Sequence, residues 1–230
     1  REIRLNWFFL RNITRSLWIG GEVLMVRNRF PGEFEDGSPD FLNNSGGWVT
    51  GAGPSVMFDN RHRTLAPTKG ALVEIAPLFV GTGGAGDHKY NRITVDARHY
   101  FPSFGDGSAM AFQFIFDYAG QDAPFYEIPQ LGGKERLRGI GHPLRKTGNA
   151  VWLARGELRQ PVWWRFGAVV FAEAGRASDG YNNPFDEVIG SFGGGLRFRI
   201  LPDDPLNVRF DAGVSTMGTT GFYISLKEAF

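Results

Sequence analysis

Apolar and polar side chains alternate along most of this 230-residue chain, and this pattern constrains the fold more than any other feature. Successive side chains of a β-strand point to opposite faces, whereas an amphipathic helix repeats about every 3.6 residues. In the segment NVRFDAGVS, residues 207–215, valine, phenylalanine and alanine alternate with arginine, aspartate and serine. The pattern predicts an all-β fold of eleven strands without a helix, over residues 2–11, 16–30, 46–60, 69–81, 89–102, 108–119, 148–162, 165–177, 190–201, 207–216 and 221–230.

One face of these strands is charged and the other is apolar, and this difference indicates whether water or lipid surrounds the fold. In AVWLARGELRQ, the charged residues Arg155, Glu157 and Arg159 share one face, whereas Trp152 lies on the other. Aromatic residues also gather at strand ends, as at Trp163 and its neighbour. A soluble sandwich with one dry face is the alternative. Closely spaced charges of both signs opposite an aromatic-rich apolar face favour an antiparallel transmembrane β-barrel with a polar interior.

The connections alternate in length along the chain. Long or glycine- and acid-rich segments alternate with tight ones, and only the segment 59–68 is long on the short-turn side. Long loops at one end and short turns at the other are typical of outer-membrane barrels. The long set comprises 31–45, 82–88, 120–147 and 178–189, and the short set comprises 12–15, 103–107, 163–164 and 202–206.

Composition and motifs argue against catalysis, cofactors and nucleic acid. The net charge of +1 provides no field for nucleic acid, and the absence of cysteine excludes disulfides, thiolate zinc sites and a cysteine nucleophile. The segment GTGGAG at 81–86 matches a dinucleotide-binding pattern, but a strand follows it where a helix would be needed. The acidic segment 32–40 could hold calcium loosely, although a solvated loop is the simpler interpretation. The histidines lack metal-ligand spacing; they are His62, His88, His99 and His142.

Three stretches, taken in order, resemble one known family. GAGPSVMFDNRHRTLAPTKG contains a D-x-R and P-T-x-G turn, QLGGKERLRGIGHP contains an Arg-Gly tip, and the last stretch ends in GFYISLKEAF. Together they resemble the Omp85 superfamily, the outer-membrane barrels similar to BamA and TamA that are also called the surface antigen D15 family. The residues that carry the resemblance are Asp59, Arg61, Pro67 and Gly70 in the turn, Arg138, Gly139 and Ile140 in the loop, and Gly221, Phe222, Ile224, Leu226 and Phe230 at the end.

The resemblance implies a place for the polar loop. In this family the loop folds into the barrel lumen, where its arginine is held by an acid in an F-x-D-x-G pattern. Here the pattern is Phe171, Glu173 and Gly175, so the resemblance pairs Arg138 with Glu173. The alternation independently puts Phe171 and Glu173 on the inward face. Two departures stand out, since Ile140 replaces the usual aromatic residue and glutamate replaces the usual aspartate.

The number of strands suggests that the barrel domain, residues 1–230, is incomplete at its N-terminus. Bacterial single-chain barrels have an even number of strands with both ends on the periplasmic side. Eleven strands with a periplasmic C-terminus would leave the N-terminus outside. A missed strand within 1–30 is the alternative. The resemblance implies a barrel of 16 strands, of which this chain would supply the last eleven, with no POTRA domain.

The function implied by the resemblance is assembly or translocation of other proteins at the outer membrane of a Gram-negative bacterium. A lateral seam formed on one side by 221–230 and the lumenal loop would serve it, without catalytic residues, metal or cofactor. The expected partners are outer-membrane lipid, client outer-membrane proteins and accessory lipoproteins. A stand-alone or enzyme-linked barrel, for example one with a patatin-like domain, is the alternative and would act as an anchor or pore. A soluble lipid- or sugar-binding sandwich is a third.

Overall fold

A computed structural model describes residues 2–29, 46–141, 144–179, 186–201 and 206–230. Eleven strands form one antiparallel sheet in which each strand pairs with its neighbours in chain order. All eleven strands expected from the alternation are present, and two short ones within the long loop, β7 and β8, were not expected. The strands are β1 (Glu2–Thr14), β2 (Leu17–Asn28), β3 (Gly47–Asp59), β4 (Gly70–Val80), β5 (Tyr90–Pro102), β6 (Ala109–Ala119), β7 (Gln130–Leu131), β8 (Lys146–Thr147), β9 (Ala150–Trp163), β10 (Phe166–Ser178), β11 (Ile189–Arg199), β12 (Asn207–Ser215) and β13 (Thr220–Leu226).

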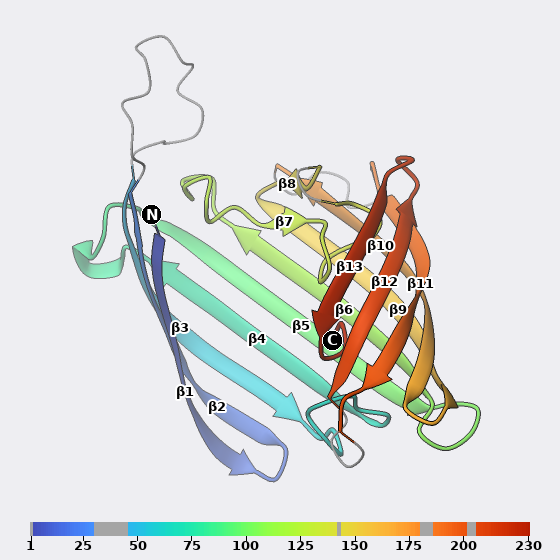
Figure 1. Ribbon diagram of the computed structural model, residues 1–230. Helices are drawn as coiled ribbons and strands as arrows, with labels where there is room; N and C mark the ends of the chain where they lie inside the picture. Colours follow the sequence, from blue (N-terminus) through green and yellow to red (C-terminus); the bar gives the residue numbers. More distant parts are fainter. Residues whose placement is uncertain (1, 30–45, 142–143, 180–185, 202–205) are drawn as a thin grey trace.

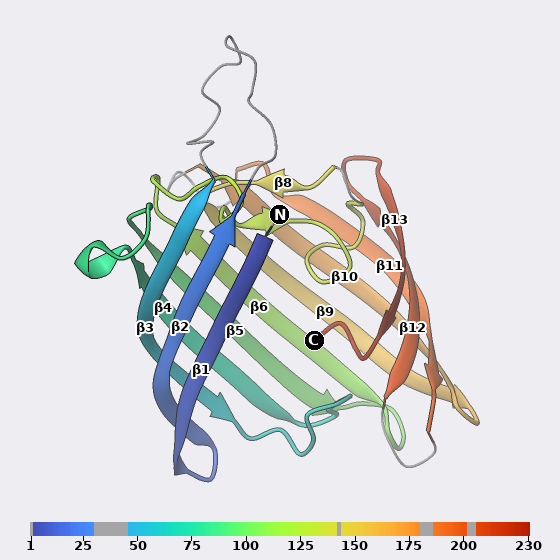
Figure 2. The same cartoon turned by 60° about the vertical axis from the view of Figure 1, so that its left-hand side comes forward.

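The sheet curls into a barrel wall with two free edges. Strands β1 and β13 lie at the ends of the strand order, and the wall is open between them (Figures 1 and 2). The described part of the long connection between β6 and β9 lies at the upper end in Figure 1, and the β1–β2, β5–β6 and β9–β10 turns lie at the lower end. Strand β1 begins at the upper end, and the β12–β13 hairpin also turns there. We call the two ends the loop end and the turn end.

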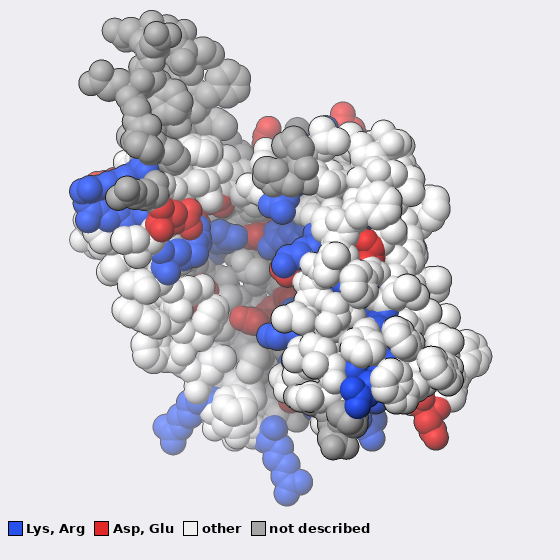
Figure 3. Space-filling model, in the orientation of Figure 1, with Lys and Arg blue, Asp and Glu red and all other residues white. Residues whose placement is uncertain are grey.

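The alternation predicted for the strands corresponds to the inner and outer faces of the wall. On β12, Arg209 and Asp211 are buried inside the barrel, whereas Phe210 and Val214 are exposed outside. On β10, Phe171 and Glu173 are buried and Val170 is exposed. Figure 3 shows charged residues within the hollow and a mostly uncharged outer wall. A barrel that is apolar outside and charged inside is the arrangement expected of a wall in contact with lipid.

Aromatic rings cluster at the turn end of the outer wall, as the sequence predicted. Trp163 stacks on Phe166 with ring centroids 6.2 Å apart, and Phe198 lies 5.2 Å from Phe166. Trp164 lies 6.3 Å from Phe198 and completes the cluster. Tyr100 is different, because its ring is buried in the interior with only 1% of its surface exposed.

The last strand is shorter than predicted. The sequence predicted a strand over 221–230, but β13 ends at Leu226. Lys227 has a positive φ of 68°, which turns the chain away from the strand direction. The following residues bend into the barrel, where Phe230 is buried, and Figure 2 places the C-terminal end inside the curved sheet. Residues 227–230 therefore make contacts inside the barrel and do not continue the strand.

Several smaller expectations can be compared with the structure. The segment 81–86 forms a turn that contains only a three-residue 3-10 helix, η1 (Thr82–Gly84), so a dinucleotide-binding helix is absent there. No helix in the described part of the chain is long and apolar enough to cross a membrane. The acidic segment 32–40 and His142 lie outside the described residues.

Candidate functional site in the barrel lumen

The connection between β6 and β9 turns into the barrel and forms a compact tip. Inside the tip, Gly133 N donates to Ile140 O at 2.8 Å and Ile140 N donates to Leu137 O at 3.2 Å. Arg136 N donates to Gly133 O at 3.2 Å, and Gly132 N donates back to Arg136 O. These backbone bonds hold the Arg-Gly segment as a defined turn before any contact with the wall is considered. We call residues 132–140 the loop tip.

Arg138 at the loop tip is completely buried among carboxylates of the wall. Its Nε lies 2.8 Å from Glu173 Oε1, and its Nη1 lies 2.7 Å from Glu157 Oε1 and 3.0 Å from Asp211 Oδ2. The backbone N of Arg138 also donates to Glu173 Oε2 at 2.6 Å. The pair expected from the sequence is therefore present, and two further acids join it. Burial lowers the pKa of Arg138, but the three carboxylates outweigh burial and raise it above its ordinary value.

All three residues of the F-x-E-x-G pattern on β10 contact the loop. The ring of Phe171 lies under the Arg138 guanidinium, with 3.4 Å between Cζ and the ring centroid. Glu173 binds both the side chain and the backbone of Arg138. A Cβ on Gly175 would lie 2.9 Å from the side chain of Leu131, so this glycine leaves room for the residue that precedes the loop tip. Phe171, Glu173 and Gly175 thus form one continuous surface of β10 against which the loop packs.

The rest of the tip contacts the strands at the C-terminal side of the sheet. Gly139 N donates to Ser191 Oγ at 2.8 Å, and Thr219 Oγ1 donates to Gly139 O at 2.8 Å. The hydroxyl of Tyr223 on β13 donates to Ile140 O at 3.0 Å. The side chain of Ile140 is fully buried in an apolar cluster that also contains Ile115, Leu131, Leu137, Val151 and Leu153. Ile140, which stands in place of the usual aromatic residue, is thus buried among aliphatic side chains.

Glycines make the close approach of loop and wall feasible. A Cβ on Gly139 would lie 2.6 Å from Ser215 N. From the other side, a Cβ on Gly221 would lie 2.2 Å from Arg138 O, and one on Gly213 would lie 3.1 Å from Gly139 N. These distances are below normal contact. A side chain at Gly139 would therefore overlap the wall, and one at Gly213 or Gly221 would overlap the loop backbone. Gly221, predicted as part of a seam, faces inward and contacts the loop.

A second anchor holds the first part of the loop near the opposite edge of the sheet. The buried carboxylate of Glu127 accepts from Arg4 on β1 and lies 3.4 Å from Arg92 on β5. Next to it, the Tyr126 hydroxyl lies 3.2 Å from His88 Nε2. Burial and the nearby Glu127 carboxylate raise the pKa of Tyr126 to about 12. The loop therefore contacts both β1 and β13, the two edge strands.

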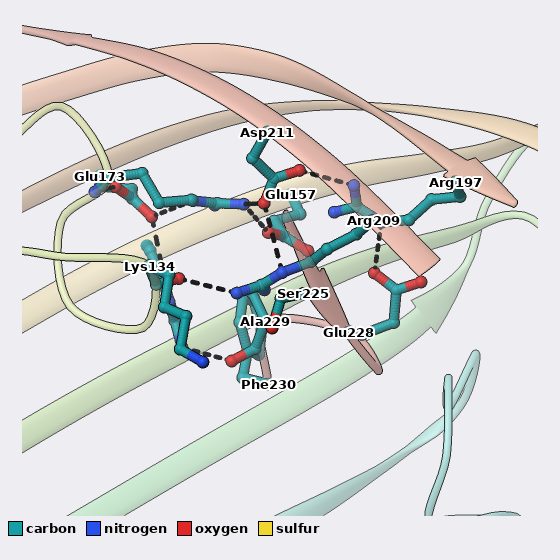
Figure 4. Close-up of polar contacts among 12 residues, drawn as sticks. Lys134, Glu157, Glu173, Arg197, Arg209, Asp211, Ser225, Glu228, Ala229 and Phe230 are labelled. Carbon is teal, nitrogen blue, oxygen red and sulfur yellow. Dashed lines mark hydrogen bonds and ion pairs between the residues drawn. The ribbon is translucent and has the colours of Figure 1, made fainter. Parts of the chain in front are cut away.

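The ion network continues from the loop tip towards the turn end. Arg209 Nη2 donates to Lys134 O at 3.0 Å, and Arg197 joins Asp211 at 2.6 Å (Figure 4). Arg197 in turn lies 2.7 Å from Glu228. The sequence interpretation did not identify Glu157, Asp211 or Glu228 as partners. The inward orientation of Glu157 and Asp211 followed from the alternation, whereas Glu228 shares the face of outward Phe222 and Ile224 and is turned inward by the bend after β13. Nothing in the pattern indicated which of the inward charges would meet Arg138.

The predicted turn motif lies apart from the lumenal site, at the turn end. Asp59 accepts from Arg61 Nη2 at 2.7 Å and from Arg61 N at 3.0 Å. Pro67 is buried, and Gly70 has a φ of 100° in a place where a Cβ would lie 2.6 Å from Asn60 O. The motif shapes the long turn between β3 and β4. It contributes no side chain to the Arg138 network.

Phe171→Leu is expected to weaken the folded barrel by about 2 kcal/mol, because leucine cannot provide the cation–π contact with a desolvated guanidinium. The measurement is urea unfolding in lipid vesicles, followed by the change in gel migration of the folded barrel. The matched control is Phe192→Leu on β11, which alters an exposed outer-wall ring. Equal losses in the two variants would contradict a specific contribution of the Phe171 ring.

Comparisons with known proteins agree with this architecture. The domain model of the Omp85 superfamily matches residues 29–225. The crystal structure of BamA from Haemophilus ducreyi lacking POTRA domains 1-3 is similar, with a TM-score of 0.66 and 17% identity over 98% of this chain and 52% of that one. CdiB from Acinetobacter baumannii gives a TM-score of 0.68 and 16% identity over 99% of this chain and 42% of that one. The chain therefore spans about half the length of these structures. A comparison with curated protein sequences found no match.

Proposed function

This chain belongs to the Omp85 superfamily, and from that premise we propose that it assists the assembly or translocation of other proteins at the outer membrane of a Gram-negative bacterium. The fold is shared with BamA and CdiB. The apolar outer wall contacts lipid, and the charged interior holds the loop. In this proposal, the edge of β13 binds the client strand and the loop tip supports β13 from the interior.

The observation that carries the proposal is the orientation of the β13 backbone. Lys227 N donates to Asn207 O and Ser215 N donates to Thr219 O, both at 2.9 Å, at the two ends of the β12–β13 ladder. Residues of an antiparallel pair alternate between bonding to the partner strand and pointing away from it. The even-numbered residues, Phe222 and Ile224 among them, therefore direct their N–H and C=O groups away from β12. No strand in the described part of the chain pairs with that edge.

Such an edge can take up another strand by backbone hydrogen bonding. In a closed barrel the first strand would pair with it, so a client strand would reach this edge where that seam opens. The side chains of Phe222, Ile224 and Leu226 point outward and are 58% exposed or more, so an added strand would meet an apolar surface at the lipid boundary. From the interior, the loop tip contacts the same strand through Tyr223. We infer that the loop supports β13 while its outer edge receives a client strand.

The test is photo-crosslinking in the complete protein within its own membrane. A benzophenone amino acid in place of Ile224 should crosslink to newly made outer-membrane or secreted proteins. The same probe in place of Phe192, which is exposed on β11 away from the edge, is the matched control. Depletion of the protein should also reduce the amount of folded client. Crosslinks that are equal at both positions, together with unchanged client levels, would contradict the proposal and favour an anchor or pore.

A further inference from the structure

Residues 227–230 lie in the barrel interior, where side chains of the wall bind them. The Glu228 carboxylate accepts from Arg197 Nε and from Asn207 Nδ2, each at 2.7 Å. Arg155 Nη2 donates to Ala229 O at 3.0 Å. Glu228 and Ala229 therefore each have a specific polar partner on the wall.

The ring of Phe230 is held between two arginines and a tyrosine. The Cζ atoms of Arg155 and Arg159 lie 4.4 and 4.9 Å from its centroid. The Tyr100 ring lies 6.2 Å away, and Arg159 Nη2 donates to Phe230 O at 3.1 Å. Guanidinium groups favour the face of an aromatic ring, and most strongly where water is excluded. The site thus recognises an aromatic ring as well as a carboxylate. We call these wall residues, Tyr100, Arg155, Arg159, Arg197 and Asn207, the tail site.

The charges around this site favour an anion. Among the described residues of the network, five arginines (Arg138, Arg155, Arg159, Arg197 and Arg209) share four carboxylates (Glu157, Glu173, Asp211 and Glu228). Removal of Glu228 would leave five arginines with three carboxylates. Because a buried charge without a partner is strongly unfavourable, an empty tail site would favour a replacement that carries a carboxylate.

The segment does not satisfy every donor of the site, and the site can be reached. Arg159 Nη1 and Arg197 Nη2 are buried and have no hydrogen-bond partner among the described residues. Both arginines line a cavity of about 190 Å³ at the turn end, together with Asn207 and Glu228. Three more arginines, Arg63, Arg165 and Arg199, also line it, which makes the approach to the tail site basic. The segment leaves β13 through the positive φ of Lys227, a conformation that costs a residue with a side chain some energy.

We propose that the tail site is a peptide-binding site for segments of another protein with the pattern acidic residue, any residue, aromatic residue, and that residues 228–230 occupy it in cis. The carboxylate would bind Arg197 and Asn207, and the ring would lie between Arg155 and Arg159. The tethered segment competes at a high effective concentration, so a peptide in trans binds well only when the tether is weakened. Such a site would add to client handling, but its binding is measurable without any client, so each proposal can fail separately.

The experiment measures the fluorescence anisotropy of a labelled, amidated peptide, SLKEAF, with the complete protein in nanodiscs. The doubly substituted protein, Glu228→Gln with Phe230→Ala, should bind the peptide about ten-fold more tightly than the wild type. Phe192→Ala removes an exposed outer-wall ring from β11, away from both the tail site and the β13 edge, and should bind like the wild type. The peptide SLKQAA should bind the double variant about ten-fold more weakly than SLKEAF. Heat-modifiable gel migration verifies folding of each variant.

A second measurement does not depend on the double variant folding. The 230 residues contain no cysteine, so a spin label at Lys227→Cys reports on this segment alone, in a complete protein whose other cysteines, where present, are replaced. Excess SLKEAF should increase the mobility of the label, and SLKQAA should not. Equal effects of the two peptides, or equal affinity of the wild type and the double variant, would overturn the proposal and leave the segment as an internal anchor only.

Discussion

Arg138→Ala is expected to destabilise the folded barrel by about 3–5 kcal/mol, the cost of removing one partner from a buried charge cluster. The substitution leaves Glu157, Glu173 and Asp211 facing one another without the guanidinium that now lies within 3.0 Å of all three. Of the ion pairs that Glu173 makes within the described part of the chain, only that with Arg155 at 4.0 Å would remain, so the desolvation of this buried carboxylate would be poorly compensated. The loop tip would also lose the contact with Phe171, so we expect it to leave its docked position.

Two measurements check this expectation. The folded band in unheated gels should convert to the unfolded band at a lower temperature than in the wild type. Trypsin should also cut the loop, which carries Lys134, Arg136 and Arg145 as additional cleavage sites. Arg145→Ala is the matched control, because this arginine lies on the same connection, is exposed to solvent, and among the described residues hydrogen-bonds only to Gln130 Oε1, at 3.3 Å. A variant Arg138→Ala that melts and resists trypsin like Arg145→Ala would contradict a structural role for the network.

Gly221→Ala is expected to displace the loop tip by adding a single methyl group, at a cost of about 3 kcal/mol, the upper end for overpacking. The added Cβ would lie 2.2 Å from Arg138 O and 2.6 Å from Tyr223 Oη. Neither β13 nor the loop tip can move away easily, because the atom nearest to the added Cβ, Arg138 O, belongs to the backbone. Limited trypsin digestion should therefore detect a more accessible loop.

The control for this substitution is Gly156→Ala on β9. There the Cβ would lie 3.2 Å from the ring of Phe112, which is exposed on the outer wall and can move towards lipid. We expect unchanged loop digestion in that variant. A protected loop in Gly221→Ala would show that the wall, and not the loop, adjusts to the methyl group.

The alternation predicted much of this architecture because a strand offers only two faces. Once Phe171 and Glu173 were on the polar face, their inward position followed without knowledge of any neighbour. The alternation also distinguished inward Arg209 and Asp211 from outward Phe210. The strands most firmly predicted, such as β12, are those in which every second residue is charged or small.

Three features could not be predicted, because they depend on register or on packing in the interior. Asp211 meets Arg138 across 73 residues of sequence, and a shift of one residue in any intervening strand pair would turn a different face inward. The burial of Ile140 depends on an aliphatic cluster drawn from β6, β9 and the loop. The inward bend at Lys227 follows from arginines on strands far from the end of the chain.

The contacts of the loop tip also set an order of events in time. Arg138 and Gly139 precede their partners in the chain: Glu173 follows by 35 residues, Asp211 by 73 and Thr219 by 80. During synthesis and membrane insertion the loop therefore exists before the surfaces that hold it. Contacts across such long stretches of chain form late in folding, because the ends of a long loop meet only at an entropic cost. The tip can be locked only after β12 and the last hairpin have joined the wall, so its docking marks the completion of this part of the barrel.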